Sequence, residues 1–187
     1  MSIADKACPS DMLSATVATL GHDGKKDIEK VEELIDDYPR DARLHFLRGS
    51  LLAGLTRYAE ARQAMEAAVE LAPDYALARF QLGFLELTSG EAAAAVLTWA
   101  PLRSLRPDDP LRRFAGGLEH LIRDEFPTAL SMLREGIELN TEIAPLNADM
   151  ALIIRRVEEL LAEKPAGSDD VSATHLLLQQ YSGRTKH

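Results

Sequence analysis

Hydrophobic residues recur at helical spacing in paired segments along the middle of the chain. In residues 42–55 the apolar positions that share one helical face are Leu44, Leu47, Leu51 and Leu52. In residues 58–71 the corresponding positions are Tyr58, Ala61, Met65, Ala68, Val69 and Leu71. Apolar residues three or four positions apart lie on one side of an α-helix. The pattern therefore predicts two short amphipathic helices joined by a turn.

The paired pattern repeats every 34 residues. Five columns keep this interval in a single register: Pro39, Pro73 and Pro107; Gly49, Gly83 and Gly117; Ala61, Ala95 and Ala129; Phe46, Phe80 and Phe114; Leu71, Leu105 and Leu139. A glycine opposite an alanine lets two helix backbones approach, because neither side chain holds them apart. Met65, Trp99 and Leu133 are placed to fill the space one turn further on.

Prolines and aspartates mark the expected helix ends. The prolines of the repeated column stop each second helix. Asp41, Asp74 and Asp109 are placed to cap the helix that follows, and Pro110 suits a first helical turn. Pro101 lies inside the expected second helix of the third unit, where it removes a helical hydrogen bond. We expect a kink there, or an early end of the helix.

At these residues the chain resembles the tetratricopeptide repeat family, whose unit is a pair of antiparallel helices. The second unit matches the family pattern with Gly49, Tyr58, Ala61, Met65, Ala68 and Pro73; the third with Gly83, Ala92, Ala95, Trp99 and Pro107; the fourth with Gly117, Phe126, Ala129, Leu133 and Gly136. The first unit is eroded, with Asp27 where the family has Ala, and its two helices are expected over residues 10–20 and 27–38. The resemblance implies an all-α, right-handed α-solenoid of about four repeats.

After the repeats, residues 144–163 carry a long helical pattern with a polar side, typical of a capping helix. Residues 164–170 resemble a linker, and residues 171–181 form a short apolar segment. We therefore expect a repeat domain with its capping helix over residues 1–164, and a linker with a short C-terminal helical tail over residues 165–187.

Composition narrows the functional classes. A net charge of −9 argues against nucleic acid as a partner, because phosphate binding needs a basic surface. The single cysteine, Cys8, excludes a disulfide framework within the chain. No basic start precedes an apolar run, and no apolar stretch reaches the roughly 20 residues of a membrane span. We expect a soluble cytoplasmic protein that does not bind membranes.

The sequence offers no constellation for catalysis or metal binding. The five histidines are not spaced as zinc ligands, and Cys8 has no second thiol beside it. The carboxylate pairs Glu32–Glu33 and Asp36–Asp37 lie on an expected exposed helix, where nothing desolvates them. We expect a protein that is not an enzyme and needs no cofactor or metal.

The family resemblance implies a concave groove lined by the first helix of each unit. Carried over to this chain, the peptide-binding positions are Arg43, Phe46, Ser50, Leu77, Phe80, Phe84, Leu87, Leu111, Phe114, Leu118 and Leu121. The three phenylalanines of one column would form an aromatic stripe; alternatively, they are buried between units. Members that clamp a C-terminal carboxylate use Lys, Asn and Arg at such positions, and this chain lacks that set.

An apolar groove suits an amphipathic helix or an apolar peptide. A partner protein could supply it, or residues 171–181 could, from the same chain or a second copy. The sequence thus favours a non-catalytic adaptor, scaffold or assembly factor. The alternatives are a chaperone resembling type III secretion chaperones and a self-assembling structural scaffold.

Overall fold

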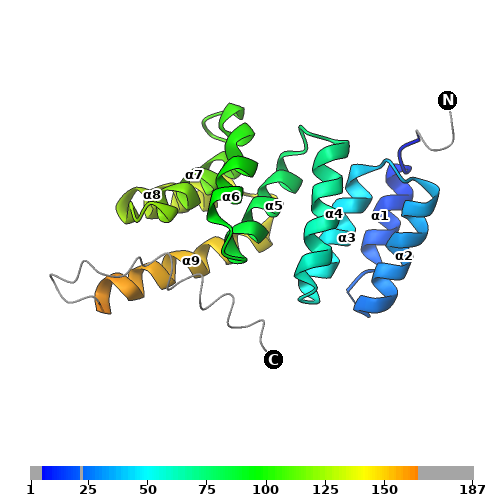
Figure 1. The fold of residues 1–187 in the computed structure, drawn as a ribbon, viewed down its shortest axis with the longest axis horizontal. Coiled ribbons are helices and arrows are strands. Elements are labelled where there is room, and N and C mark those ends of the chain that lie inside the picture. The colour runs from blue at the N-terminus through cyan, green and yellow to red at the C-terminus, as the bar shows by residue number, and fades with distance from the viewer. Residues whose placement is uncertain (1–5, 22, 164–187) are drawn as a thin grey trace. The chain divides into compact units, whose positions relative to one another are not determined.

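The computed structural model describes residues 6–21 and 23–163, and every element of regular structure in these ranges is helical (Figure 1). The helices are α1 Ser10–Ala18, α2 Gly24–Asp37, α3 Ala42–Gly54, α4 Tyr58–Leu71, α5 Ala76–Thr88, α6 Ala92–Trp99, the 3-10 helix η2 Ala100–Ser104, α7 Pro110–Ile122, α8 Phe126–Leu139 and α9 Ala144–Glu163. The chain divides into two compact units, residues 1–85 and 86–187, and the division falls within α5.

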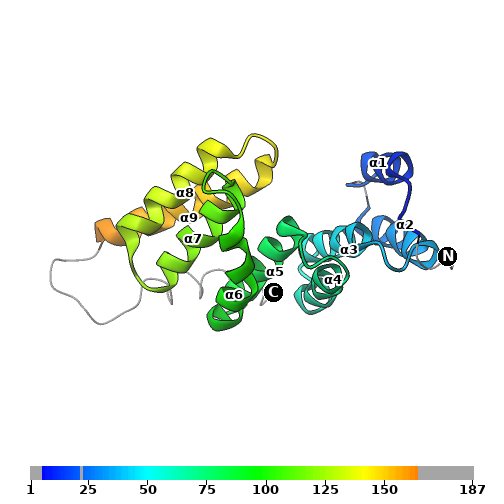
Figure 2. The same ribbon diagram turned by 90° about the horizontal axis from the view of Figure 1, so that it is seen from above.

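In the first unit, α3 and α4 lie side by side as a helical hairpin (Figures 1 and 2). The hairpin closes at Gly49, because a Cβ atom there would lie 2.8 Å from Met65 Cγ and 3.1 Å from the Ala61 carbonyl oxygen. Around this crossing the core contains Ile28, Leu52, Ala61, Ala64, Met65, Leu82 and Leu85. The glycine–alanine approach expected from the sequence is confirmed.

The second unit repeats this crossing between α7 and α8. A Cβ atom at Gly117 would lie 2.8 Å from Leu133 Cδ2 and 3.2 Å from the Ala129 carbonyl oxygen. The helix α9 packs on α8 and has the predicted bounds. It buries Leu146, Met150, Ile153, Ile154 and Val157, and it exposes Arg155, Arg156, Glu158 and Glu159.

The predicted capping aspartates and prolines lie at helix ends in the structure. Asp41 Oδ1 accepts a hydrogen bond of 3.0 Å from the Arg43 backbone N–H, and Asp109 Oδ1 accepts one of 2.9 Å from that of Leu111. The cap at Asp74 stays a prediction. Helix α6 ends at Trp99, and a 3-10 turn carries Pro101, so the proline ends the α-helix early. Pro110 begins α7.

The turn inside each hairpin has a left-handed residue at one repeat position. Thr56, Gly90 and Asp124 are 34 residues apart, with φ of 60°, 87° and 58°. Glycine and aspartate tolerate this conformation, whereas a β-branched threonine adopts it at a cost. The sequence did not reveal this column, because three different residue types occupy it.

The first helical pair departs most from the pattern. Helix α1 ends at Ala18 rather than at the expected Leu20, and none of its side chains is buried. Helix α2 begins at Gly24, three residues before the expected start, because Asp23 caps it. Asp27 is buried in the alanine column and accepts a 2.7 Å hydrogen bond from the Gly21 N–H. This bond gives the buried carboxylate a partner at the turn.

Among the described helices, none is long and apolar enough to cross a bilayer. The predicted linker and tail over residues 165–187 lie outside the described residues.

Replacing Gly136 by alanine tests the packing in the second unit. A Cβ atom there would lie 2.5 Å from the Phe114 ring, so Gly136→Ala should lower the free energy of unfolding by about 1–2 kcal/mol. Gly54, the last residue of α3, has nothing within 4 Å of its Cβ position. Gly54→Ala is therefore the control and should leave stability unchanged or raise it by up to about 1 kcal/mol. Urea unfolding measures both, and equal effects would contradict the packing.

Candidate functional site

Six residues of the first unit that lie on α3, directly before α5 or on α5 are partly exposed, and we group them as one face. The α3–α5 face comprises Arg43, Phe46, Ser50, Tyr75, Leu77 and Phe84. The Phe46 and Tyr75 rings contact each other with centroids 5.3 Å apart and planes tilted by 60°. The Phe84 ring stacks on that of Phe80, with centroids 6.2 Å apart and planes 8° apart. These ring contacts hold the aromatic side chains of the face in fixed positions.

The other predicted groove residues are buried, which corrects the expectation of a stripe of three exposed phenylalanines. They are Phe80, Leu87, Leu111, Phe114, Leu118 and Leu121. The Phe114 ring occupies the space that Gly136 leaves empty on α8. A phenylalanine of this column is therefore buried where the facing helix has a small residue. In this column, Phe46 alone keeps an exposed part.

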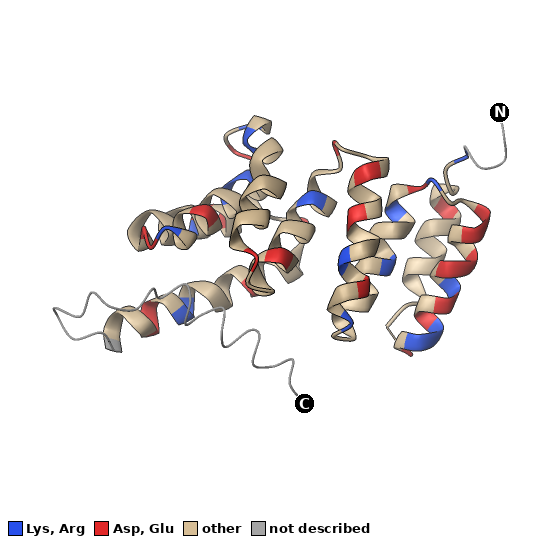
Figure 3. Cartoon of the chain, in the orientation of Figure 1, with Lys and Arg blue, Asp and Glu red and all other residues tan. Residues whose placement is uncertain are grey.

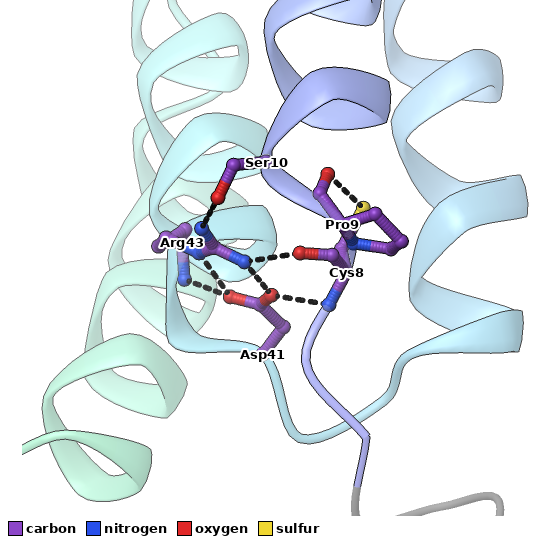
Figure 4. A network of polar contacts seen from close by, with 5 residues as sticks. All are labelled: Cys8, Pro9, Ser10, Asp41 and Arg43. Carbon is purple, nitrogen blue, oxygen red and sulfur yellow. Dashed lines mark hydrogen bonds and ion pairs between the residues drawn. The ribbon is translucent and has the colours of Figure 1, made fainter.

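Arg43 organises a polar network that ties the N-terminal segment to the start of α3 (Figure 4). Its Nη2 donates to Asp41 Oδ2 and to the Cys8 carbonyl oxygen, both at 2.6 Å, and its Nε donates to Asp41 Oδ1 at 3.0 Å. The Cys8 backbone N–H donates to Asp41 Oδ2 at 2.8 Å. The guanidinium is thus already committed within the chain, so Arg43 acts at the edge of the face as a fixed group.

Burial and charge set the ionisation of this network. Burial alone would raise the pKa of Asp41, but the hydrogen bonds from Arg43 and Cys8 outweigh it and lower that pKa. Burial, with the Asp41 charge, raises the pKa of the Cys8 thiol. A buried thiol with a raised pKa is a poor nucleophile at neutral pH.

The Ser50 hydroxyl of the face is also engaged. Ser50 Oγ donates a 3.0 Å hydrogen bond to the Phe46 carbonyl oxygen, as expected for a serine inside a helix. The face therefore offers aromatic and aliphatic surface with one fixed cation at its edge. Sequence reasoning missed Tyr75, because it precedes α5 and is outside the helix whose periodicity marked the groove. Its contact with Phe46 required the structure.

Helix α3, which carries part of the face, has two arginines and no acidic residue. Its neighbour α2 has Asp and Glu along its length (Figure 3). Across residues 6–21 and 23–163, no three His, Cys, Asp or Glu side chains gather as a metal site would require.

The repeated hairpins and their crossings define the chain as an all-α helical-repeat protein. No protein-family model and no curated protein matches the sequence.

Solved structures do match the fold. One described as "Crystal structure of MamA" has a TM-score of 0.52 at 20% identity, covering 62% of this chain and 68% of that chain. Another, "MamA 41-end from Desulfovibrio magneticus RS-1", has a TM-score of 0.56 at 13% identity, covering 95% of each chain. A third, "MamA RS-1 ArsTM double mutant", has a TM-score of 0.52 at 14% identity, covering 87% of each. At these identities the likeness shows the fold, and the predicted all-α helical-repeat class is confirmed.

Asp41→Asn should weaken the network while keeping an oxygen for the helix cap. We expect the free energy of unfolding at neutral pH to fall by about 1–3 kcal/mol, since charge-assisted hydrogen bonds are lost. Because the folded-state pKa of Asp41 is lowered, its contribution is present above the unfolded carboxyl pKa of about 4 and is lost as the pH falls through the folded value.

Denaturant unfolding of wild type and Asp41→Asn, followed from neutral pH to well below the unfolded carboxyl pKa of about 4, measures this difference. The two proteins should converge in acid. Asp36→Asn, at an exposed position of α2, is the control. A gap that stays constant across this pH range would exclude the charge as its source.

Proposed function

We propose that the chain is a non-catalytic protein-interaction module that binds an amphipathic helix or apolar peptide on the α3–α5 face. The observation that carries this proposal is the partly exposed, fixed aromatic and aliphatic surface of Phe46, Tyr75, Leu77 and Phe84. Aromatic residues held by their neighbours lose little side-chain entropy on binding, which favours them as contact residues.

The chemistry of this face supports a protein ligand over a reaction. The hydroxyl of Ser50 and the guanidinium of Arg43 already have partners within the chain. An apolar strip with a polar edge matches a helix that presents hydrophobic residues on one side. Such an adaptor or scaffold acts by holding its partner.

The fold is compatible with this proposal, because stacked helical hairpins present extended concave surfaces that repeat proteins use for binding. Fold alone does not fix function, so the argument rests on the face itself. Residues 171–181 of this chain or of a second copy remain among the ligands that this chemistry would accept.

A photo-crosslinking amino acid at position 50 tests the proposal. Ser50 lies on α3 one turn from Phe46, so a bound polypeptide should crosslink there when the purified full chain is exposed to cell extract. The same amino acid at Glu138, an exposed position on α8, is the control. We expect crosslinked segments with an amphipathic helical pattern at position 50, identified by mass spectrometry.

The crosslinked segment is then synthesised and its affinity measured by calorimetry. Phe46→Ala/Phe84→Ala should weaken binding by about 2 kcal/mol or more, roughly thirtyfold. Leu97→Ala removes an equally apolar but 76% exposed side chain on α6 and should leave the affinity unchanged. Crosslinks no stronger at position 50 than at 138, or equal affinity in the double variant, would reject the α3–α5 face as the binding surface.

A further inference from the structure

A cavity of about 260 Å³ lies between η2, α7 and α8 in the second unit. Its apolar wall includes Trp99, Leu102 and Met132, and its charged residues are Arg103, Arg112 and Glu119. None of these residues belongs to the α3–α5 face. The cavity therefore needs its own explanation.

The repeat register shows how the cavity arises. One helical face of α5 carries Ala78, Leu82 and Leu85, all buried, and the two leucines belong to the core of the first unit. The positions 34 residues later, on α7, are Arg112, Gly116 and Glu119. Two packing leucines are replaced by a glycine and a carboxylate. Volume is lost and charge is introduced at the same place.

The repeat that begins with α3 shows that a charge at these positions is tolerated when it is paired with a residue of another helix. On α3 the corresponding positions are Leu44, Arg48 and Leu51, and Arg48 Nε donates to Glu32 Oε1 of α2 at 2.9 Å. The repeat that begins with α3 keeps both of its leucines. The repeat that begins with α7 differs, because it combines the missing side chain of Gly116 with charges of both signs.

Glu119 is the most constrained group of the cavity. Its side chain is 8% exposed, and its Oε2 accepts a 2.7 Å hydrogen bond from Arg103 Nη2. Within the described part of the chain, no group donates to Glu119 Oε1. This oxygen is open to solvent, and a carboxylate oxygen on a largely buried side chain favours a cationic hydrogen-bond donor.

The two arginines of the cavity favour a negatively charged group on the ligand. Arg103 is 60% exposed at the rim, and Arg112 Nη1 donates to the Leu105 carbonyl oxygen at 2.6 Å. Each guanidinium carries five N–H groups, so both keep donors for a ligand carboxylate. A simple cation would meet two arginines, and a simple anion would leave Glu119 Oε1 with water as its only donor.

We propose that this cavity binds a small zwitterion of the α-amino-acid class. Its ammonium group donates to Glu119 Oε1, its carboxylate accepts from Arg103 and Arg112, and its apolar side chain packs against Trp99, Leu102 and Met132. The volume suits a molecule of this small size, since the pockets of drug-sized ligands measure roughly 300–1,000 Å³. The site is independent of the proposed protein-binding face.

Trp99 is the only tryptophan of the chain and lines the cavity, so its fluorescence reports occupancy. The full chain is titrated with L-leucine, L-methionine and L-phenylalanine. We expect a saturable change with at least one of them, at a dissociation constant in the millimolar range or below.

Two derivatives of leucine distinguish a free zwitterion from the end of a peptide. N-acetyl-L-leucine keeps the carboxylate and represents a peptide C-terminus, whereas L-leucinamide keeps the ammonium and represents an N-terminus. Each should bind at least about tenfold more weakly than leucine, because one buried charge partner is lost. A derivative that binds as well as leucine overturns the zwitterion assignment on the wild-type protein alone.

Variants place the ligand in the cavity. Glu119→Gln should weaken amino-acid binding about tenfold. Gly116→Leu restores the side chain of the preceding repeat and should abolish binding; its Cβ would meet the Met132 methyl at 2.5 Å, which is the free end of a flexible side chain. Glu138→Gln, exposed on α8, is the control. No saturable signal with any of the three amino acids, or unchanged binding in a folded Gly116→Leu protein, overturns the proposal.

Discussion

The fold depends on one repeated contact, the close crossing of two helices at a glycine. At Gly49 and Gly117 the facing backbone and a large side chain occupy the space where a Cβ atom would stand. The large side chain, Met65 in one hairpin and Leu133 in the other, lies over the glycine and is buried. Helices that approach this closely gain dispersion contacts along their shared side. The rest of each hairpin is positioned by this contact.

The proposed binding regions occur where a residue differs in type or in burial from the residue at the same position of another repeat. Phe114 is sealed against Gly136, whereas Phe46 of the same column contacts Tyr75 and keeps exposed surface. Leu82 packs in a core, whereas Gly116 at the same repeat position lines a cavity. A solenoid unit can vary in this way because its stability is set by its own packing and that of its neighbours.

Much of the fold was predictable because the signals were local or periodic. The 34-residue columns gave the hairpins, Asp41 and Asp109 gave two caps, and Pro101 gave the early end of α6. The expected start of α2 was wrong, since Asp23 caps the helix three residues earlier. The local sequence signals thus predicted which helices form more reliably than where each helix begins and ends.

The site was less predictable, because exposure depends on what faces a residue across a helix pair. The carry-over from the family treated Phe46, Phe80 and Phe114 as equivalent, yet two of the three are fully buried. The network around Arg43 joins residues up to 35 positions apart in sequence, and Tyr75 enters the face from outside a helix. The cavity arises at Gly116, and only the alignment of Gly116 with Leu82 shows that a packing side chain is missing there.

Nuclear Overhauser contacts in the isotopically labelled full chain test the central crossing most directly. The structure predicts strong contacts between the Gly49 α-protons and the Met65 side chain, and between the Gly117 α-protons and the Leu133 methyl groups. If both pairs are observed, the hairpins cross at these glycines. If neither pair gives a contact while the helices are intact by chemical shift, the crossing is elsewhere, and the hairpin packing on which this account rests is contradicted.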